Sequence, residues 1–218
     1  MKVQIALLSL LLAAPLATQA GDLDYTYVEG GAMRHYPDMS AWDQPERRNG
    51  AYLRGSFAFG EKLYAYGDIS RTTGESARFM AGGPDIAWFD YKYTLGQFGL
   101  GAHHPLNDHT DALVELAYVH LNERRSTTYR PFPTAATRFS NSEKGTQLRL
   151  GLREALTERV EGWMKVGYIS MHRGSPVDNG YTGEAGIQFK ITPRWGVVAD
   201  AQYLQAVTTY SLGVRANF

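Results

Sequence analysis

The sequence lacks cysteine altogether, and only 9 of its 218 residues are proline. Without cysteine the chain can form no disulfide, thiolate metal site or cysteine nucleophile. Lys+Arg and Asp+Glu both total 22, so there is no net charge to attract nucleic acid. Beyond the first twenty residues, no apolar run approaches the ~20 residues that a membrane-spanning helix needs.

Glycine and tyrosine, by contrast, are abundant, with 23 and 14 residues. The mean hydropathy of −0.34 would ordinarily indicate a soluble protein. A transmembrane β-barrel has the same mild value, because only alternate residues of each strand face lipid.

The first twenty residues have the pattern of a secretory signal peptide. Lys2 provides a charged start, residues 5–12 are apolar, and the small residues that end at Ala20 match a cleavage site. The alternative is a membrane anchor, but the run is too short and Pro15 interrupts it. We therefore expect residues 1–20 to be removed and residues 21–218 to form one exported domain.

The last strand alternates perfectly up to the final residue. Its apolar side carries Tyr210, Leu212, Val214, Ala216 and Phe218, whereas polar and small residues occupy the other side. This ending resembles the closing strand of bacterial outer-membrane β-barrels, in which a terminal Phe is the assembly signal. The resemblance implies that Tyr210, Leu212 and Phe218 contact the barrel-assembly machinery.

The same period of two recurs along the chain and predicts an all-β, antiparallel, up-and-down transmembrane barrel. We expect about ten strands, with eight as the alternative, and an even number is typical of bacterial single-chain barrels. The expected strands are 23–33, 51–59, 63–70, 86–103, 111–122, 146–153, 161–171, 181–190, 195–203 and 208–218.

The connections between these strands alternate in length. Long, polar segments are expected at 34–49, 71–85 and 123–144, and short turns at 60–62, 104–109 and 156–159. Outer-membrane barrels have short periplasmic turns and longer surface loops. The alternation therefore predicts a protein of the outer membrane with both termini in the periplasm, in contact with outer-membrane lipid and lipopolysaccharide.

A soluble, lipocalin-like barrel could show the same alternation with its apolar face inward. Aromatic residues near the strand ends favour lipid outside, as in the interfacial girdles of membrane barrels. These residues are Tyr25, Phe57, Phe59, Tyr168, Tyr181, Phe189, Trp195, Tyr203, Tyr210 and Phe218.

The opposite face then lines the lumen and is rich in charge. It carries Glu29, Arg54, Glu115, Arg149, Arg153, Glu161, Lys165, Glu184, Lys190, Asp200 and Arg215. We expect Glu29 to lie between Arg54 and Arg215. A ten-stranded lumen is narrow, so paired charges would plug it. The alternative is a selective channel for small solutes.

Metal and catalytic sites are weakly indicated. His103, His104 and His109 match no standard zinc spacing, and adjacent strand histidines point to opposite faces. His120 shares the lipid side with Tyr118, so no triad partner can orient it inside the barrel. His35 and His172 are expected in loops, again without a triad partner.

No phosphate loop, nucleophile elbow or zinc motif occurs. The sequence therefore predicts a non-enzymatic barrel without cofactor or nucleic-acid partner, and a monomer. A surface enzyme acting on lipid A is the least favoured alternative.

The expected loop 123–144 combines basic and aromatic side chains. They are Arg124, Arg125, Arg130, Arg138 and Lys144, with Tyr129, Phe132 and Phe139. Such a surface segment could contact lipopolysaccharide phosphates or a host ligand. The plainer alternative is a solvated loop.

Several strand motifs point to a narrower family. The segments 27–31 (YVEGG), 50–59, 161–168 (EGWMKVGY) and 194–197 (RWGV) resemble small proteobacterial outer-membrane barrels often labelled quorum-sensing or diffusible-signal-factor associated. The resemblance covers the strands from Tyr25 to Phe218 and implies a barrel without known catalytic residues.

Overall fold

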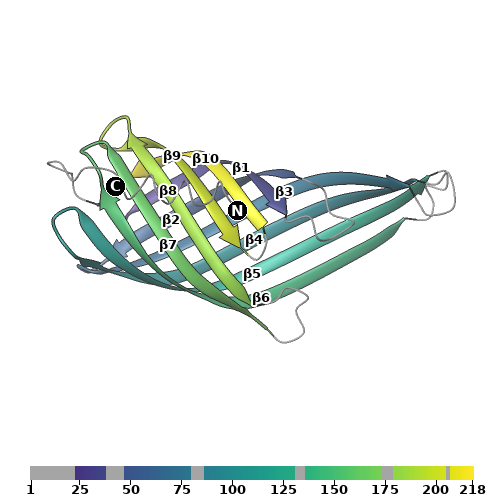
Figure 1. The fold of residues 1–218 in the computed structure, drawn as a ribbon, viewed down its shortest axis with the longest axis horizontal. Helices are drawn as coiled ribbons and strands as arrows, with labels where there is room; N and C mark the ends of the chain where they lie inside the picture. Colours follow the sequence, from purple (N-terminus) through teal and green to yellow (C-terminus); the bar gives the residue numbers. More distant parts are fainter. Residues whose placement is uncertain (1–22, 38–46, 80–85, 131–135, 173–178, 205–206) are drawn as a thin grey trace.

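A computed structural model describes residues 23–37, 47–79, 86–130, 136–172, 179–204 and 207–218. These form a closed antiparallel barrel of ten strands (Figure 1). The strands are β1 (Tyr27–Pro37), β2 (Arg48–Phe59), β3 (Leu63–Phe79), β4 (Ile86–Pro105), β5 (Thr110–Arg130), β6 (Thr137–Ala155), β7 (Val160–Met171), β8 (Gly180–Lys190), β9 (Trp195–Leu204) and β10 (Val207–Asn217). The ten-strand prediction is confirmed. The expected signal peptide lies outside the described residues.

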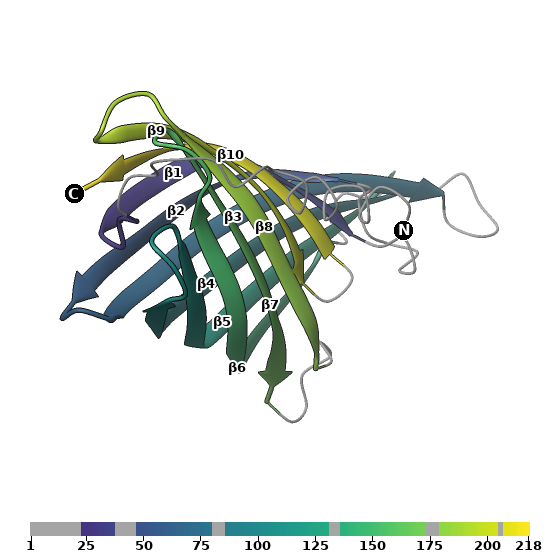
Figure 2. The ribbon, with the colours of Figure 1, turned by 60° about the vertical axis from the view of Figure 1, so that its left-hand side comes forward.

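Each strand pairs with its neighbours in the chain, and β10 closes the barrel against β1 (Figure 2). At this seam Glu29 lies opposite Arg215 on β10 and opposite Arg54 on β2. Chain order thus equals spatial order, as an up-and-down barrel requires.

The alternation along each strand sorts the side chains by face. On β10, Leu212 is 61% exposed on the outside, whereas its neighbour Ser211 is buried on the inside. The same pattern gives the outside a belt of exposed apolar residues, which includes Ile69, Phe98 and Val166. An apolar outside and a polar inside are the arrangement of a transmembrane barrel. Among the described residues, no helix is long and apolar enough to cross a membrane.

Short turns join the strands at the end of the barrel where β1 begins. Residues 60–62 connect β2 to β3, and Gly60 there has φ = 73°, in the left-handed region that favours glycine. The turns 106–109 and 156–159 also lie near their predicted positions.

The predicted long loops at 71–85 and 123–144 are wrong over most of their length. Residues 71–79 continue β3, residues 123–130 continue β5, and residues 137–144 begin β6. The ladder is continuous to the ends of these strands, since Ile86 pairs with both Phe79 and Arg130. Beyond the lipid, the outer face need not be apolar, so a strand there loses the alternation that identifies it in sequence.

The segment 34–49 is also shorter as a loop than predicted. Strand β1 continues to Pro37 and β2 already begins at Arg48. Residues 38–46 lie outside the described residues.

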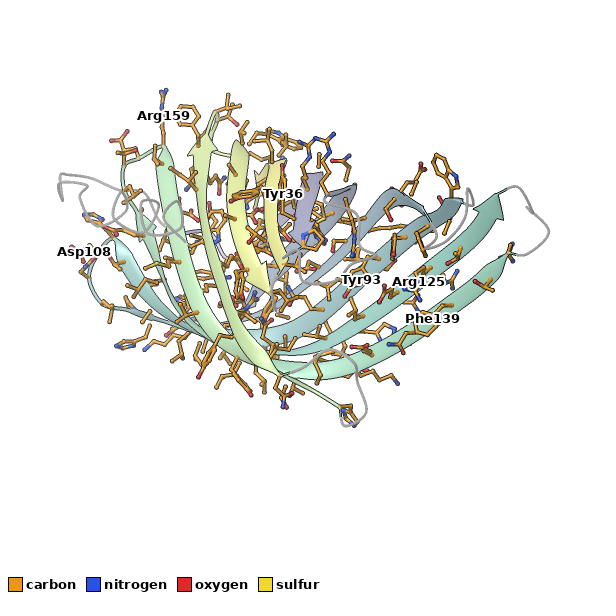
Figure 3. The ribbon with its side chains drawn as sticks, turned by 45° about the vertical axis from the view of Figure 1, so that its right-hand side comes forward. Tyr36, Tyr93, Asp108, Arg125, Phe139 and Arg159 are labelled. Atoms are coloured by element: carbon orange, nitrogen blue, oxygen red, sulfur yellow. The ribbon has the colours of Figure 1, made fainter. Side chains whose placement is uncertain are left out.

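Strands β3 to β6 consequently extend well beyond the rest of the barrel. They contain 17, 20, 21 and 19 residues, whereas a bilayer-crossing strand needs about 9–11. The excess of roughly eight residues corresponds to about 25 Å of strand. Figure 3 shows this protruding sheet, with Tyr93, Arg125 and Phe139 on it, at the end opposite the turn residues Asp108 and Arg159.

Inside the barrel, aromatic rings lie directly over glycines of neighbouring strands. A Cβ built on Gly186 would meet the Trp163 ring at 2.2 Å, and one built on Gly101 would meet the Tyr64 ring at the same distance. Any larger residue would displace these rings. The glycines thus let bulky, polar-tipped aromatics lie flat in a narrow lumen.

Candidate functional site

The lower part of the lumen, toward the short turns, contains a network of charged side chains. The structure brings together five carboxylates and five cations from different strands: Glu29, Glu115, Glu161, Glu184, Asp200, Arg54, Arg149, Arg153, Lys165 and Arg215. The two signs therefore balance within the network. Each of the ten side chains contacts at least one of opposite charge.

The first group of ion pairs lies across the closing seam. Arg215 donates from Nη2 to Glu29 Oε2 at 2.6 Å, and its Nη1 donates to Gln188. Arg54 Nη1 lies 3.3 Å from Glu29 and 3.0 Å from Asp200. Glu29 is completely buried, so it depends on these two arginines for compensation of its charge.

The second group spans β5 to β8. Arg149 lies 2.8 Å from Glu115 and 3.1 Å from Glu184. Lys165 Nζ donates to Glu115 Oε1 at 3.0 Å. Glu184 also accepts a hydrogen bond from the Trp163 indole at 2.8 Å. Both carboxylates therefore have two or more donors.

The third group lies nearest the turns. Arg153 Nε donates to Glu161 at 2.6 Å, and its Nη2 donates to the Asp24 carbonyl at 2.7 Å. The same guanidinium lies 4.5 Å from the centre of the Tyr25 ring. Tyr25 in turn donates to Asp111. This layer closes the turn end of the lumen.

The network leaves little free space. The cavity among these side chains measures about 50 Å³, and one of about 30 Å³ lies between Arg149 and Glu184 and the apolar residues above them. Each is enough for one or two waters. Asp68, Gln97 and Tyr64 also belong to this layer, since Gln97 donates to Asp68 and Tyr64 donates to Glu115. They did not figure in the predicted network. The alternation of side chains along the strand predicts from the sequence that Asp68 faces inward. Which residue Asp68 contacts depends on how the strands are paired.

The upper part of the lumen has a different character. A cavity of about 640 Å³ opens there, above Arg54 and Asp68. Buried Val119, Ile169 and Met171 form an apolar cluster on its wall, with Leu95 and Leu204 packed against them.

Arg48 and His35 line this upper cavity at the ends of β2 and β1, above the apolar belt. Sequence reasoning placed both in a loop, and the structure corrects this: they are paired strand residues that face inward, 4% and 7% exposed. Burial and the charge of Arg48 lower the pKa of His35 to about 4. His35 is therefore neutral at physiological pH, and Arg48 supplies the charge at this level.

A second charged surface lies outside the barrel, on the protruding sheet. Its outward face carries four exposed cations, Arg71, Lys92, Arg124 and Arg138, one on each of β3 to β6. We call them the basic band. Lys92 and Arg124 lie directly opposite each other in the β4–β5 ladder, and like charges in such pairs repel. Within the described residues, none of the four forms an ion pair.

Two residues of the basic band, Arg124 and Arg138, were expected in the loop 123–144, and the structure corrects this by placing them on β5 and β6. Of the aromatic residues predicted there, Phe139 contacts Arg125, whose guanidinium lies 5.6 Å from its ring centre. The four basic side chains are among those that line an outer hollow of about 1570 Å³. Phe132 lies outside the described residues.

The histidines do not converge. His103 points inward and its Nδ1 lies 3.0 Å from Asp111, whereas His104 is exposed. His120 faces outward, where its Nε2 lies 3.4 Å from Ser142 Oγ. Among the described residues, no three His, Asp or Glu side chains gather as a metal site would require.

The residues of the predicted assembly signal lie at the seam. Tyr210 and Leu212 project outward from β10, and the Phe218 backbone donates to the Thr26 carbonyl at 3.0 Å. The Arg194 guanidinium lies 5.1 Å from the Phe218 ring centre. The expected cleavage site at Ala20 is outside the described residues.

No protein-family model matches this chain, and neither does any curated protein sequence. Among solved structures, the translocator domain of the autotransporter NalP from Neisseria meningitidis has a TM-score of 0.53 and 14% identity, covering 100% of this chain and 95% of its own. This likeness shows a shared barrel fold.

Two smaller barrels are similar at lower scores. Ail, the attachment invasion locus protein of Yersinia pestis, has a TM-score of 0.48 and 14% identity, covering 88% of this chain and 97% of its own. OprG from Pseudomonas aeruginosa has a TM-score of 0.45 and 13% identity, covering 93% and 99%.

Proposed function

We propose that this protein is a non-enzymatic, monomeric barrel of the bacterial outer membrane, closed to free diffusion, which uses its protruding sheet for surface interaction. In this proposal the turns and both termini lie in the periplasm and β3 to β6 project outward. Cell fractionation with heat-modifiable gel migration tests the location. A soluble periplasmic protein would contradict it.

The basic band carries the interaction half of the proposal. Ile69, exposed on the apolar belt, is two residues below Arg71 on the same face of β3. The band therefore lies at the height where the phosphates of an outer leaflet would begin. Lys92 and Arg124 lie opposite each other without an ion pair, so their positive charges repel each other. An anion bound between them would offset this repulsion. We therefore infer that the band contacts lipopolysaccharide phosphates.

A paired charge substitution tests this contact. We expect the Lys92→Gln/Arg124→Gln variant to bind lipopolysaccharide at least about 100-fold more weakly than the original, measured by native mass spectrometry of the detergent-solubilised barrel. Each of the two lost charge-assisted contacts is worth ~1.5–3 kcal/mol. The matched control is Lys62→Gln/Arg159→Gln, which removes the same two charges from exposed turns. Equal retention by both variants, or equal binding of dephosphorylated lipid A, would contradict the inference.

The charged network supports the closed state. Its cavities hold only a water or two, and freely conducting barrels have about 16 strands or more. The alternative is a narrow selective channel, and planar bilayer recordings separate the two. We expect no stable single-channel steps. Regular steps that vanish when Gln202, which lines the lumen, is replaced by Trp would favour the channel.

Two further parts of the proposal have their own tests. Barrel-assembly machinery is the proposed partner of β10, so deleting Phe218 should lower membrane levels of the protein severalfold. Replacing Asn107 in a periplasmic turn should have no effect on those levels. Equal levels of both variants would speak against the assembly role.

The proposal also includes the family likeness and the absence of enzymatic activity. Membership of the barrels labelled quorum-sensing associated rests on strand motifs such as residues 161–168. No nucleophile–base pair faces the lumen from His120, which lies on the outside beside Ser142. An unchanged lipid A mass spectrum in a deletion strain is the expected result, and a changed one would restore the enzyme alternative.

A further inference from the structure

The upper cavity combines an apolar wall with one buried cation. Its volume of about 640 Å³ lies within the ~300–1,000 Å³ typical of small-molecule sites. Six of the apolar side chains that line it come from four strands, β4, β5, β7 and β9: Leu95, Val119, Leu121, Ile169, Met171 and Leu204. The charged network lies beneath them, so the cavity ends blindly inside the barrel.

Arg48 differs from every cation of the network below. It is only 4% exposed, and its Nε has no hydrogen-bond partner. The Nε of Arg149 in the network also lacks one, but Arg149 has two carboxylates within ion-pair distance. Within the described residues no carboxylate reaches ion-pair distance of it, Glu123 on the facing β5 included. A buried charge without a partner is costly, so this arginine requires either a structural compensation or a ligand.

The compensation present in the protein comes from two aromatic rings and, at longer range, from the carboxylate of Glu123. The Arg48 guanidinium lies 5.6 Å from the centre of the Tyr91 ring and 5.1 Å from that of Tyr93. Ring contacts hold a guanidinium in place without using its N–H donors. Arg48 is therefore fixed in position with hydrogen-bonding capacity left over. Its neighbour His35, 3.5 Å from Thr72, supplies no negative charge.

We propose that the upper cavity binds a small amphiphilic anion. Its head, a carboxylate or a phosphate monoester, would accept hydrogen bonds from Arg48, and its aliphatic tail would pack against Val119, Ile169 and Met171. Both head groups match the fork of donors on a guanidinium. Because the network closes the cavity below, the ligand enters and leaves on the outer side and does not cross the barrel.

This inference is independent of the lipopolysaccharide contact, which involves the outer face of a different part of the sheet. It also needs no conductance. Arg159, exposed in a turn, offers a matched control for Arg48, because it is an arginine that lies outside both the cavity and the basic band.

The test uses 8-fluorooctanoate and fluorine NMR on the mature barrel in lipid nanodiscs, with empty nanodiscs to subtract partition into lipid. We expect saturable binding that octyl phosphate and octanoate displace and that octanol and octylamine do not. Arg48→Gln should weaken binding about 10- to 100-fold, as expected for a lost charge-assisted pair. Arg159→Gln should bind like the original.

A second variant separates the tail site from the charge. Val119→Trp fills the apolar wall and leaves Arg48 in place, so it should weaken binding at unchanged heat-modifiable migration. Binding of octanol equal to that of the anions, unchanged affinity in Arg48→Gln, or no saturable signal above empty nanodiscs would each overturn the proposal. Displacement by octyl phosphate alone would assign the head group to the phosphate class, and by octanoate alone to the carboxylate class.

Discussion

The two halves of the lumen hold arginine in opposite ways. In the lower half Arg215 donates twice to Glu29 and once to Gln188, and lies 4.0 Å from the Tyr27 ring centre. In the upper half Arg48 has no ion pair among the described residues; two tyrosine rings lie against it, and Glu123 attracts it only at longer range. Both side chains are almost fully buried. Burial alone therefore does not separate a structural charge from a binding one, whereas the count of satisfied donors does.

The free space follows the same division. The lower half, packed with long charged side chains and rings, has cavities of about 50 and 30 Å³, and the upper half one of about 640 Å³. Long side chains fill a narrow barrel when each charge finds a partner on a neighbouring strand. Where the inward residues are medium-sized and apolar, as at Val119 and Ile169, the ten-stranded lumen is too wide for them to meet across it.

The largest expected loss of stability comes from removing a carboxylate that two arginines share in the lower half of the lumen. Glu29→Gln leaves Arg54 and Arg215 buried without their common partner, which should destabilise the barrel by about 3–5 kcal/mol. Urea unfolding in lipid vesicles, followed by tryptophan fluorescence, measures this change. Glu75→Gln, an exposed carboxylate on the protruding sheet, is the control and should unfold like the original.

A double substitution distinguishes the cost of burying a charge without a partner from the loss of the ion pair itself. Glu161→Leu alone leaves Arg153 buried and uncompensated, and should cost about 3 kcal/mol. Adding Arg153→Met removes the second charge as well, so most of that loss should be recovered. Additive losses in the same unfolding assay would mean that this lower layer stabilises the barrel through net attraction rather than through mutual compensation.

The lower half was largely accessible from sequence and the upper half was not. Strand parity alone places Glu29 and Arg54 on the inner face, and chain order in a meander makes their strands neighbours. The interpretation of Arg48 as a binding residue depends on its contacts with Tyr91 and Tyr93. These tyrosines are more than forty positions away in the sequence, and only the register of β2, β3 and β4 brings them beside Arg48. Its segment also reads as a loop, because polar residues beyond the lipid interrupt the apolar alternation.

The protruding sheet was missed for the same physical reason. Arg124 and Arg138 lie in a stretch rich in Arg, Ser, Thr and Asn, a composition typical of loops. Strand pairing there is maintained by backbone hydrogen bonds to strands that the membrane part already aligns. The alternation of apolar and polar residues identifies a strand whose outer face contacts lipid. It does not identify a strand whose outer face contacts solvent.

Shortening an apolar side chain in the upper half of the lumen should destabilise the barrel by an intermediate amount. Ile169 is 2% exposed in the cluster with Val119 and Met171. Ile169→Ala should therefore destabilise the barrel by about 2 kcal/mol. This value is at the lower end for a core isoleucine, because the existing cavity already limits the contacts of Ile169. The unfolding assay measures it. Val166→Ala, outward and 62% exposed to lipid, should differ less from the original. A loss from Ile169→Ala as large as that from Glu29→Gln would contradict the ranking of the two halves.

The smallest expected effect comes from removing the unpaired arginine. Arg48→Met keeps an unbranched side chain that is two atoms shorter and breaks no ion pair. It gives up ring contacts worth about 1 kcal/mol and the longer-range attraction of Glu123, while the burial cost of the charge disappears. Stability should therefore stay within about 1 kcal/mol of the original or rise. Arg215→Met, measured beside it, should destabilise strongly because Glu29 and Gln188 lose their donor. If Arg48→Met were as damaging as Arg215→Met, Arg48 would be a structural charge with a carboxylate partner of its own, and the two halves of the lumen would follow one rule.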